Sequence, residues 1–82
     1  MPQTLALIVD DEPDILELLE ITLSRMGIAS KPAHDLSEAK LLLKTHSFDI
    51  CLTDLQLPDG NGLELVKHVQ THYPSTPTAV IT

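Results

Sequence analysis

The stretch "LALIVDDEPD", residues 5–14, decides the fold of this chain. Its first five residues, Leu5–Val9, are all apolar, which is typical of a strand buried on both faces of a parallel sheet. Acidic residues begin abruptly at Asp10, and Pro13 stands among them at a place where proline favours the start of a helix. The stretch therefore predicts a buried strand that ends in carboxylates and leads into a helix.

The same alternation continues along the chain, and it predicts the order β-α-β-α-β-α-β. Helix signals include a stop at Gly27, a capping box formed by Asp35 and Glu38, and an end near Tyr73. The predicted strands are residues 5–9, 28–33, 48–54 and 78–82. The predicted buried helix stripes are Ile15, Leu18, Leu19, Thr22 and Met26, then Leu36, Ala39, Leu42 and Leu43, then Leu63, Val66 and Val69.

Strands that alternate with helices form a parallel sheet with right-handed crossovers. We expect an α/β fold with strand order 2-1-3-4, in which the first helix covers one face and the other two helices cover the opposite face. Pro32 places the second strand at an edge, because proline cannot donate a ladder hydrogen bond.

Composition limits the possible functions. The chain has 82 residues, enough for one domain, and a net charge of −7, which argues against binding of nucleic acid or an anionic membrane by this segment. The apolar run near the N-terminus is too short for a signal peptide or a membrane span. A single cysteine, Cys51, excludes an internal disulfide, fits a core position and is compatible with a cytoplasmic location.

Acids stand at the carboxyl ends of two predicted strands, as Asp10 and Asp54, and a hydroxyl, Thr82, ends the last one. Parallel strands bring these ends to one rim, with Asp11 beside them. Two carboxylates about 5 Å apart repel by roughly 3 kcal/mol at an effective dielectric constant near 20. The rim therefore predicts a bound hard cation, Mg²⁺ first, beside a carboxylate able to attack phosphorus.

The helix dipole offers a simpler explanation for the acids around Pro13, because it favours acidic residues in a first turn. That explanation fits Glu12 and Asp14, but it fits Asp10 less well, since Asp10 ends a buried strand.

The motifs "VDDEPD", "TDLQLPDGNG" and "AVIT", in this order, resemble the receiver domain of two-component response regulators over essentially the whole chain. The resemblance implies a flavodoxin-like fold in which Asp54 is the phosphoacceptor. It further implies that Asp11 binds Mg²⁺ directly and Asp10 mostly through water. The remaining implied site residues are the backbone carbonyl of Gln56 as a metal ligand, Thr82 as the switch hydroxyl, and Pro58 and Gly62 in the turn after the acceptor strand.

The family fold continues with a fourth helix, a fifth strand that brings a lysine and an aromatic switch residue, and a fifth helix. None of these follows the strand at 78–82 here, so we expect residues 1–82 to form an incomplete receiver domain. The open edge of that last strand predicts self-association of the 82-residue chain.

The leading functional hypothesis is a phosphoacceptor signalling module that takes its phosphoryl group from a histidine kinase and is not a separate enzyme. Such receivers often precede a C-terminal output domain, including DNA-binding domains that regulate transcription. One alternative is a metal-dependent aspartyl phosphatase, but that chemistry wants a second acid at the position of Gln56. Another is an interaction fragment that is never phosphorylated.

Overall fold

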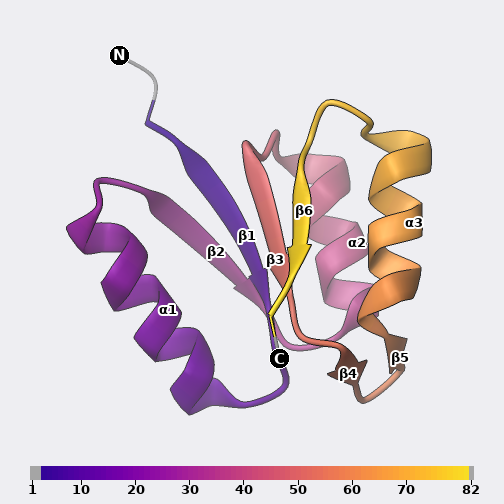
Figure 1. Ribbon diagram of the computed structural model, residues 1–82, viewed down its shortest axis with the longest axis horizontal. Coiled ribbons are helices and arrows are strands. Elements are labelled where there is room, and N and C mark those ends of the chain that lie inside the picture. Colours follow the sequence, from indigo (N-terminus) through magenta and orange to yellow (C-terminus); the bar gives the residue numbers. More distant parts are fainter. Residues whose placement is uncertain (1–2, 82) are drawn as a thin grey trace.

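The computed structural model describes residues 3–81. They form three layers, in which a parallel sheet lies between helices (Figure 1). The sheet contains four strands in the order β2-β1-β3-β6, as the sequence predicted. These strands are β1 (Leu5–Val9), β2 (Ala29–Ala33), β3 (Ile50–Thr53) and β6 (Thr78–Val80). Three of them are shorter than predicted, by one to three residues.

Helices cover both faces of the sheet in the predicted arrangement. Helix α1 (Pro13–Arg25) lies on one face, and α2 (Leu36–Thr45) and α3 (Gly62–His72) lie on the other (Figure 1). A small antiparallel hairpin, β4 (Gln56–Leu57) and β5 (Gly60–Asn61), connects β3 to α3. The sequence indicated only a turn there, because two-residue strands are too short to show a period.

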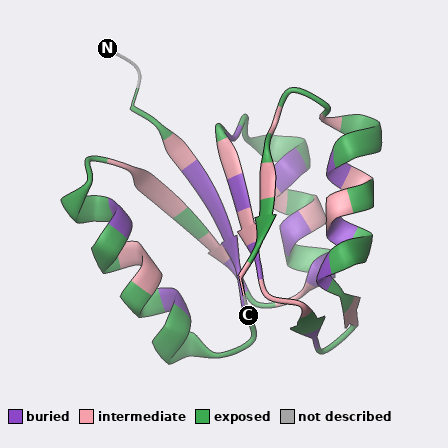
Figure 2. Cartoon of the chain, in the orientation of Figure 1, coloured by how far each residue is buried: buried purple, intermediate pink, exposed green. Residues whose placement is uncertain are grey.

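Strand β1 is an inner strand of the sheet, and Figure 2 shows it as almost continuously buried. Leu7 and Val9 pack into the larger core under α2 and α3, whereas Ala6 and Ile8 pack against α1. Successive side chains of a strand point to opposite faces, so an unbroken apolar run is what a doubly covered strand needs. Burying one such large side chain contributes about 1.5–3 kcal/mol.

The predicted buried stripe of α1 was largely wrong. The structure buries Leu16 and Leu23, with Leu19 half-buried, whereas Leu18 is 60% exposed and Met26 is 67% exposed. Helix α1 has two apolar stripes about 100° apart, and hydrophobic periodicity alone cannot choose between them. One stripe therefore remains on the surface.

In α3 the sequence missed Leu65, which is fully buried with Val69, and wrongly placed Leu63 in the core, where it is 51% exposed. The stripe of α2 was predicted correctly for Leu36, Ala39 and Leu43, while Leu42 is half-buried.

The end of α1 was predicted correctly. Gly27 has φ of +79°, its N–H donates to the carbonyl of Ser24, and the N–H of Ile28 donates to the carbonyl of Leu23. This is the Schellman motif, in which glycine adopts the left-handed conformation at low cost.

The two sheet edges differ. Strand β2 contains Pro32 and forms one edge, whereas β6 forms the other, where no strand pairs with its outer side within residues 3–81. Ala79 and Val80 are exposed there. The predicted self-association through this edge stays a prediction. Within residues 3–81, no helix is both long enough and apolar enough to cross a bilayer.

We expect the stability of the fold to fall in alkaline solution because of Cys51. This side chain is fully buried, and burial raises the pKa of its thiol from 9.0 to about 12. Between these values the unfolded thiol loses its proton while the folded thiol keeps it. Stability then decreases as the pH rises, by up to about 1.4 kcal/mol per pH unit.

Urea unfolding of the wild type and of Cys51→Ala from pH 8.5 to 10.5 would measure this effect. Because the rest of the chain is identical in the two proteins, the difference between their unfolding free energies reports on Cys51. We expect that difference to shrink as the pH rises, and a constant difference would contradict the prediction.

Candidate functional site

The carboxyl ends of the four parallel strands meet at one rim. Backbone hydrogen bonds continue the sheet one residue beyond the strands: Asp10 donates to the carbonyl of Ala33 at 3.1 Å, and Asp54 donates to that of Val9 at 2.8 Å. Ile81 donates to the carbonyl of Thr53 at 2.8 Å. Asp10 and Asp54 are therefore held on adjacent strands by the sheet itself.

Three carboxylates gather at this rim. Asp10, Asp11 and Asp54 each offer an oxygen, and these oxygens all lie within 4.8 Å of one another. Asp10 is buried, Asp54 is half-buried and Asp11 is exposed. Residues 3–81 contain no other group of three or more acidic, histidine or cysteine side chains arranged in this way. The structure thus brings together the three acids that the sequence singled out.

No cationic side chain within the described residues neutralises the charges at the rim. Burial raises the pKa of Asp10 above its ordinary value, and the charges of Asp54 and Asp11 raise it further. One hydrogen bond opposes this effect, because the N–H of Glu12 donates to Oδ1 of Asp10 at 2.9 Å. Within residues 3–81 the only ion pair is between His34 and Glu38, so no cation of the described chain pairs with the cluster.

Hydrogen bonds fix Asp54 from two sides. Its Oδ1 accepts the N–H of Leu55 at 2.8 Å, and its backbone carbonyl accepts the hydroxyl of buried Thr53 at 3.0 Å. No hydrogen bond within residues 3–81 involves its second carboxylate oxygen. One oxygen is therefore held by the backbone, while the other is available to a ligand.

Gly62 allows α3 to approach the backbone of Asp54. A Cβ atom at Gly62 would collide with the carbonyl oxygen of Asp54, and the N–H of Gly62 donates to the carbonyl of Leu55 at 2.7 Å. The side chain of Asn61 caps the helix by accepting the N–H of Leu63. Gly62 is thus the first residue of α3, directly after the hairpin.

The other residues predicted for the site lie close by in the chain. Pro58 is in the turn of the β4–β5 hairpin, and Gln56 begins β4 with an exposed side chain. The role of the Gln56 carbonyl as a metal ligand stays a prediction. Thr82 lies outside the described residues, so its predicted role as a switch hydroxyl is not placed.

A cleft of about 350 Å³ opens at the acid cluster. It is lined by Asp10, Glu12, Ile15, Asp54 and Ile81. A larger depression, of about 670 Å³, lies at the opposite end of the sheet, between the loops that precede β3 and β6. The acid cluster is not part of that depression, so the smaller cleft is the better candidate for chemistry.

The donor set fits a hard divalent cation. Carboxylate oxygens are the ligands that Mg²⁺ and Ca²⁺ prefer, and thiolate or imidazole ligands, which softer metals favour, are not part of the cluster. Three carboxylates can satisfy only part of an octahedron, as is usual for Mg²⁺, which keeps several waters. Asp10, Asp11 and Asp54 would hold such an ion.

Residues 6–82 match the family model of the response regulator receiver domain. The chain belongs to this family. It is 56% identical, over all 82 residues, to the response regulator protein PilR of Pseudomonas aeruginosa. The match covers 100% of this chain but 18% of PilR, so the chain spans about a fifth of that relative.

Solved structures show the same fold. Response regulator TrrA of Thermotoga maritima in complex with Mg²⁺ and BeF matches with a TM-score of 0.88 and 28% identity, over 92% of this chain and 65% of that chain. A structure of histidine kinase ThkA in complex with TrrA matches with a TM-score of 0.90 and 28% identity, over 96% of this chain and 68% of the matched chain. These matches confirm the flavodoxin-like receiver fold that the motifs indicated.

We expect Asp10→Asn to stabilise the metal-free domain while weakening its hold on Mg²⁺. The amide keeps the acceptor for the Glu12 N–H but removes one of the three crowded charges. Relief of repulsion at this solvent-screened rim should raise the free energy of unfolding by about 1 kcal/mol. Loss of one anionic ligand should weaken Mg²⁺ binding about tenfold.

Urea unfolding with a chelator present and calorimetric titration with Mg²⁺ measure the two effects. The control is Glu17→Gln, which removes one exposed acid of α1 and therefore changes the net charge equally. If Asp10→Asn and Glu17→Gln have the same stability, the crowding of charge at the rim is not destabilising.

Proposed function

We propose that this domain is a phosphoacceptor that takes a phosphoryl group from a histidine kinase onto Asp54 with the aid of Mg²⁺. The observation that carries the proposal is the convergence of Asp10 and Asp11 on Asp54 at the rim of a receiver fold. The complexes of TrrA with Mg²⁺ and BeF and with a histidine kinase support it by similarity.

In the proposed reaction, the carboxylate oxygen of Asp54 that makes no hydrogen bond within residues 3–81 attacks the phosphorus of a phosphohistidine on the kinase. A P–O bond forms, the P–N bond breaks, and the imidazole leaves with the electron pair and is neutralised by a proton. The product on Asp54 is an acyl phosphate. The N–H of Leu55 holds the other oxygen and so orients the carboxylate for attack.

Asp11 would bind the metal directly, Asp10 mostly through water, and the Gln56 carbonyl would complete the protein ligands. Bound Mg²⁺ supplies positive charge that offsets the carboxylates and the phosphoryl oxygens. The domain assists its own phosphorylation and dephosphorylation in this scheme and is not a separate enzyme. A cytoplasmic location also belongs to the proposal, supported by a single reduced cysteine.

Two observations favour this role over the two alternatives. Gln56, two residues after Asp54, offers no acid for an aspartyl phosphatase. An interaction fragment without phosphorylation would have no need to gather three carboxylates, a costly arrangement without a cation. We also propose that an output domain responds to phosphorylation, since the matched region is 18% of the PilR chain.

The test of the acceptor is chemical labelling. The protein at its natural length is treated with acetyl phosphate and Mg²⁺, and the acyl phosphate is reduced with borohydride before mass spectrometry. We expect the label on Asp54, and we expect it to be absent from Asp54→Asn. Labelling of another residue in the wild type, with Asp54 unmodified, would rule out the assignment.

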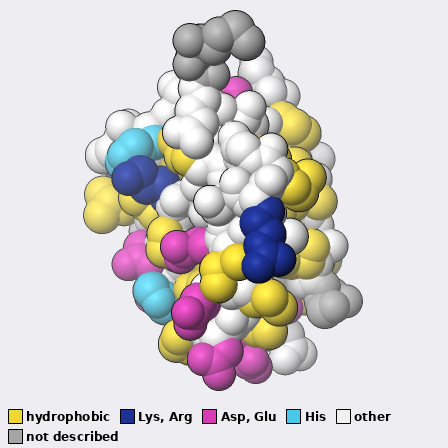
Figure 3. Space-filling view, turned by 90° about the vertical axis from the view of Figure 1, so that its left-hand side faces the viewer, with side chains coloured by type: hydrophobic (Ala, Val, Ile, Leu, Met, Phe, Trp, Pro, Cys, Tyr) yellow, Lys and Arg dark blue, Asp and Glu magenta, His cyan; other side chains and the backbone are white. Residues whose placement is uncertain are grey.

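The exposed stripe of α1 offers a surface for the kinase. Ile15 lines the cleft beside Asp10 and Asp54, and Leu18 and Ile21 extend the apolar surface along the helix, with exposed fractions of 60% and 47%. Figure 3 views this side of the molecule, where hydrophobic side chains lie among acidic ones. A partner that delivers phosphate to Asp54 must cover the cleft, so it would contact this stripe. We propose that the kinase docks here.

We expect Leu18→Gln to slow phosphotransfer from the kinase about tenfold, because loss of one buried interface anchor costs on the order of 1–2 kcal/mol. Phosphorylation by acetyl phosphate should not change, since Leu18 is not part of the cleft lining.

The matched control is Leu41→Gln on α2, which removes an equally exposed leucine, 61% against 60%, on the other face of the sheet. The donor is the histidine kinase from the same genome that phosphorylates the wild type fastest. Equal rates for the two variants with this kinase would place docking elsewhere.

A further inference from the structure

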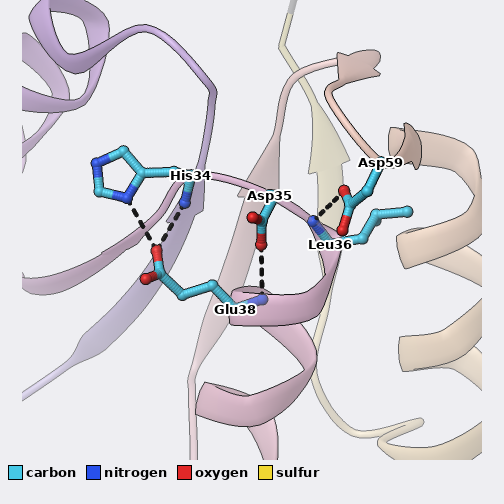
Figure 4. Close-up of polar contacts among 5 residues, drawn as sticks. All are labelled: His34, Asp35, Leu36, Glu38 and Asp59. Atoms are coloured by element: carbon cyan, nitrogen blue, oxygen red, sulfur yellow. Dashed lines mark hydrogen bonds and ion pairs between the residues drawn. The ribbon is translucent and has the colours of Figure 1, made fainter.

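A carboxylate outside the acid cluster connects two parts of the fold that are distant in sequence. Oδ1 of Asp59, in the turn of the hairpin, accepts the N–H of Leu36 at 2.8 Å (Figure 4). Oδ2 accepts both the N–H of Ser37 at 3.1 Å and its hydroxyl at 3.0 Å. Asp59 therefore holds the first turn of α2, more than 20 residues earlier in the chain, through three hydrogen bonds.

Helix α2 already has a cap of its own. The side chain of Asp35 accepts the N–H of Glu38 at 2.8 Å, and its carbonyl accepts the N–H of Ala39 at 3.1 Å. The first four N–H groups of a helix have no partner within the helix. The side chain of Asp35 accepts the N–H of the third helical residue, Glu38, and Asp59 accepts those of the first two, Leu36 and Ser37.

Apolar contacts join the same two segments. A Cβ atom at Gly60 would collide with Cδ1 of Leu36 and would lie 3.2 Å from a carboxylate oxygen of Glu64. The side chain of Leu36, which is 4% exposed, therefore packs directly on the backbone of the hairpin. Polar and apolar contacts together hold the hairpin against one turn of α2.

Both ends of the hairpin lie close to Asp54. Its first residue, Gln56, follows Asp54 by two positions, and its last, Asn61, precedes the glycine that packs on the carbonyl of Asp54. A shift of the hairpin would displace both the segment that carries Asp54 and the start of α3. The position of the hairpin is thus a constraint on the site.

We propose that Asp59 is a positioning residue for the phosphoacceptor site, acting through its hydrogen bonds to α2 on the loop that follows Asp54. The inference rests on the function proposed above. The same hydrogen bonds, that from the Leu36 N–H first, hold the pKa of Asp59 below its usual value, so its carboxylate remains ionised in neutral solution. An ionised acceptor also suits the positive end of the α2 dipole.

The competing explanation is that Asp59 merely stabilises α2, as any cap would. Asp35→Ala is the matched control, because it removes the other cap of the same helix turn without touching the hairpin. Asp59→Ala removes all three bonds, and Asp59→Asn keeps one acceptor oxygen and should restore part of the function.

The first measurement is calorimetric titration with Mg²⁺ of the protein at its natural length. We expect Asp59→Ala to weaken binding about tenfold, the low end for residues that orient metal ligands. Asp35→Ala should stay within about twofold of the wild type, and Asp59→Asn should lie between the wild type and Asp59→Ala. Equal affinities for Asp59→Ala and Asp35→Ala would overturn the proposal.

The second measurement needs no metal and separates this proposal from the proposed function. Amide hydrogen exchange of Leu55 and Gly62, both next to Asp54, should be several-fold faster in Asp59→Ala than in Asp35→Ala. If these rates are equal, Asp59 does not position the loop. If the wild type binds no Mg²⁺, the proposed function fails, and faster exchange in Asp59→Ala alone would still support the positioning role.

Discussion

Repulsion among three carboxylates at one rim is the constraint on which the rest of the structure depends. Asp10, Asp11 and Asp54 each place a carboxylate oxygen within 4.8 Å of the others, so their negative charges repel one another. A flexible chain would move these groups apart. Here the backbones of Asp10 and Asp54 are bonded laterally to neighbouring strands, so separating them would require breaking the sheet.

The sheet can hold the acids together because β1 is so deeply embedded. Ala6, Leu7, Ile8 and Val9 are all fully buried, and alternate residues contribute to the cores on opposite faces. The hydrophobic energy of this strand offsets the electrostatic cost at its end. Functional sites often retain such locally unfavourable arrangements at the expense of stability. A bound cation would convert the cost into affinity, because it interacts with all three charges at once.

The sequence was sufficient for the architecture and for the acid cluster. An apolar run followed directly by an acid defines where a strand ends, and parallel topology then places all such ends on one rim. These inferences depend on local pattern and on chain order, both of which are visible in "LALIVDD" and "ICLTD".

Sequence reasoning failed where two patterns compete or where contacts are distant. Helix α1 has two apolar stripes, and only the docked structure shows that Leu16 and Leu23 face the sheet while Leu18 faces outward. The bonds from Leu36 and Ser37 to Asp59 join residues more than 20 positions apart, and no spacing rule indicates such a pair. Asp59 and Gly60 were visible in the sequence only as turn residues.

The glycines of "PDGNG" do more than permit a turn, because both allow close packing. At Gly60 and at Gly62 the space for a Cβ atom is taken, by the side chain of Leu36 and by the backbone of Asp54 respectively. Each glycine thus lets a helix come into direct contact with the loop after β3. Close packing of this kind transmits small displacements, because dense interiors have few voids to absorb them. A displacement of the Asp54 backbone would therefore also displace the first turns of α2 and α3, because the contacts at Gly60 and Gly62 are close-packed.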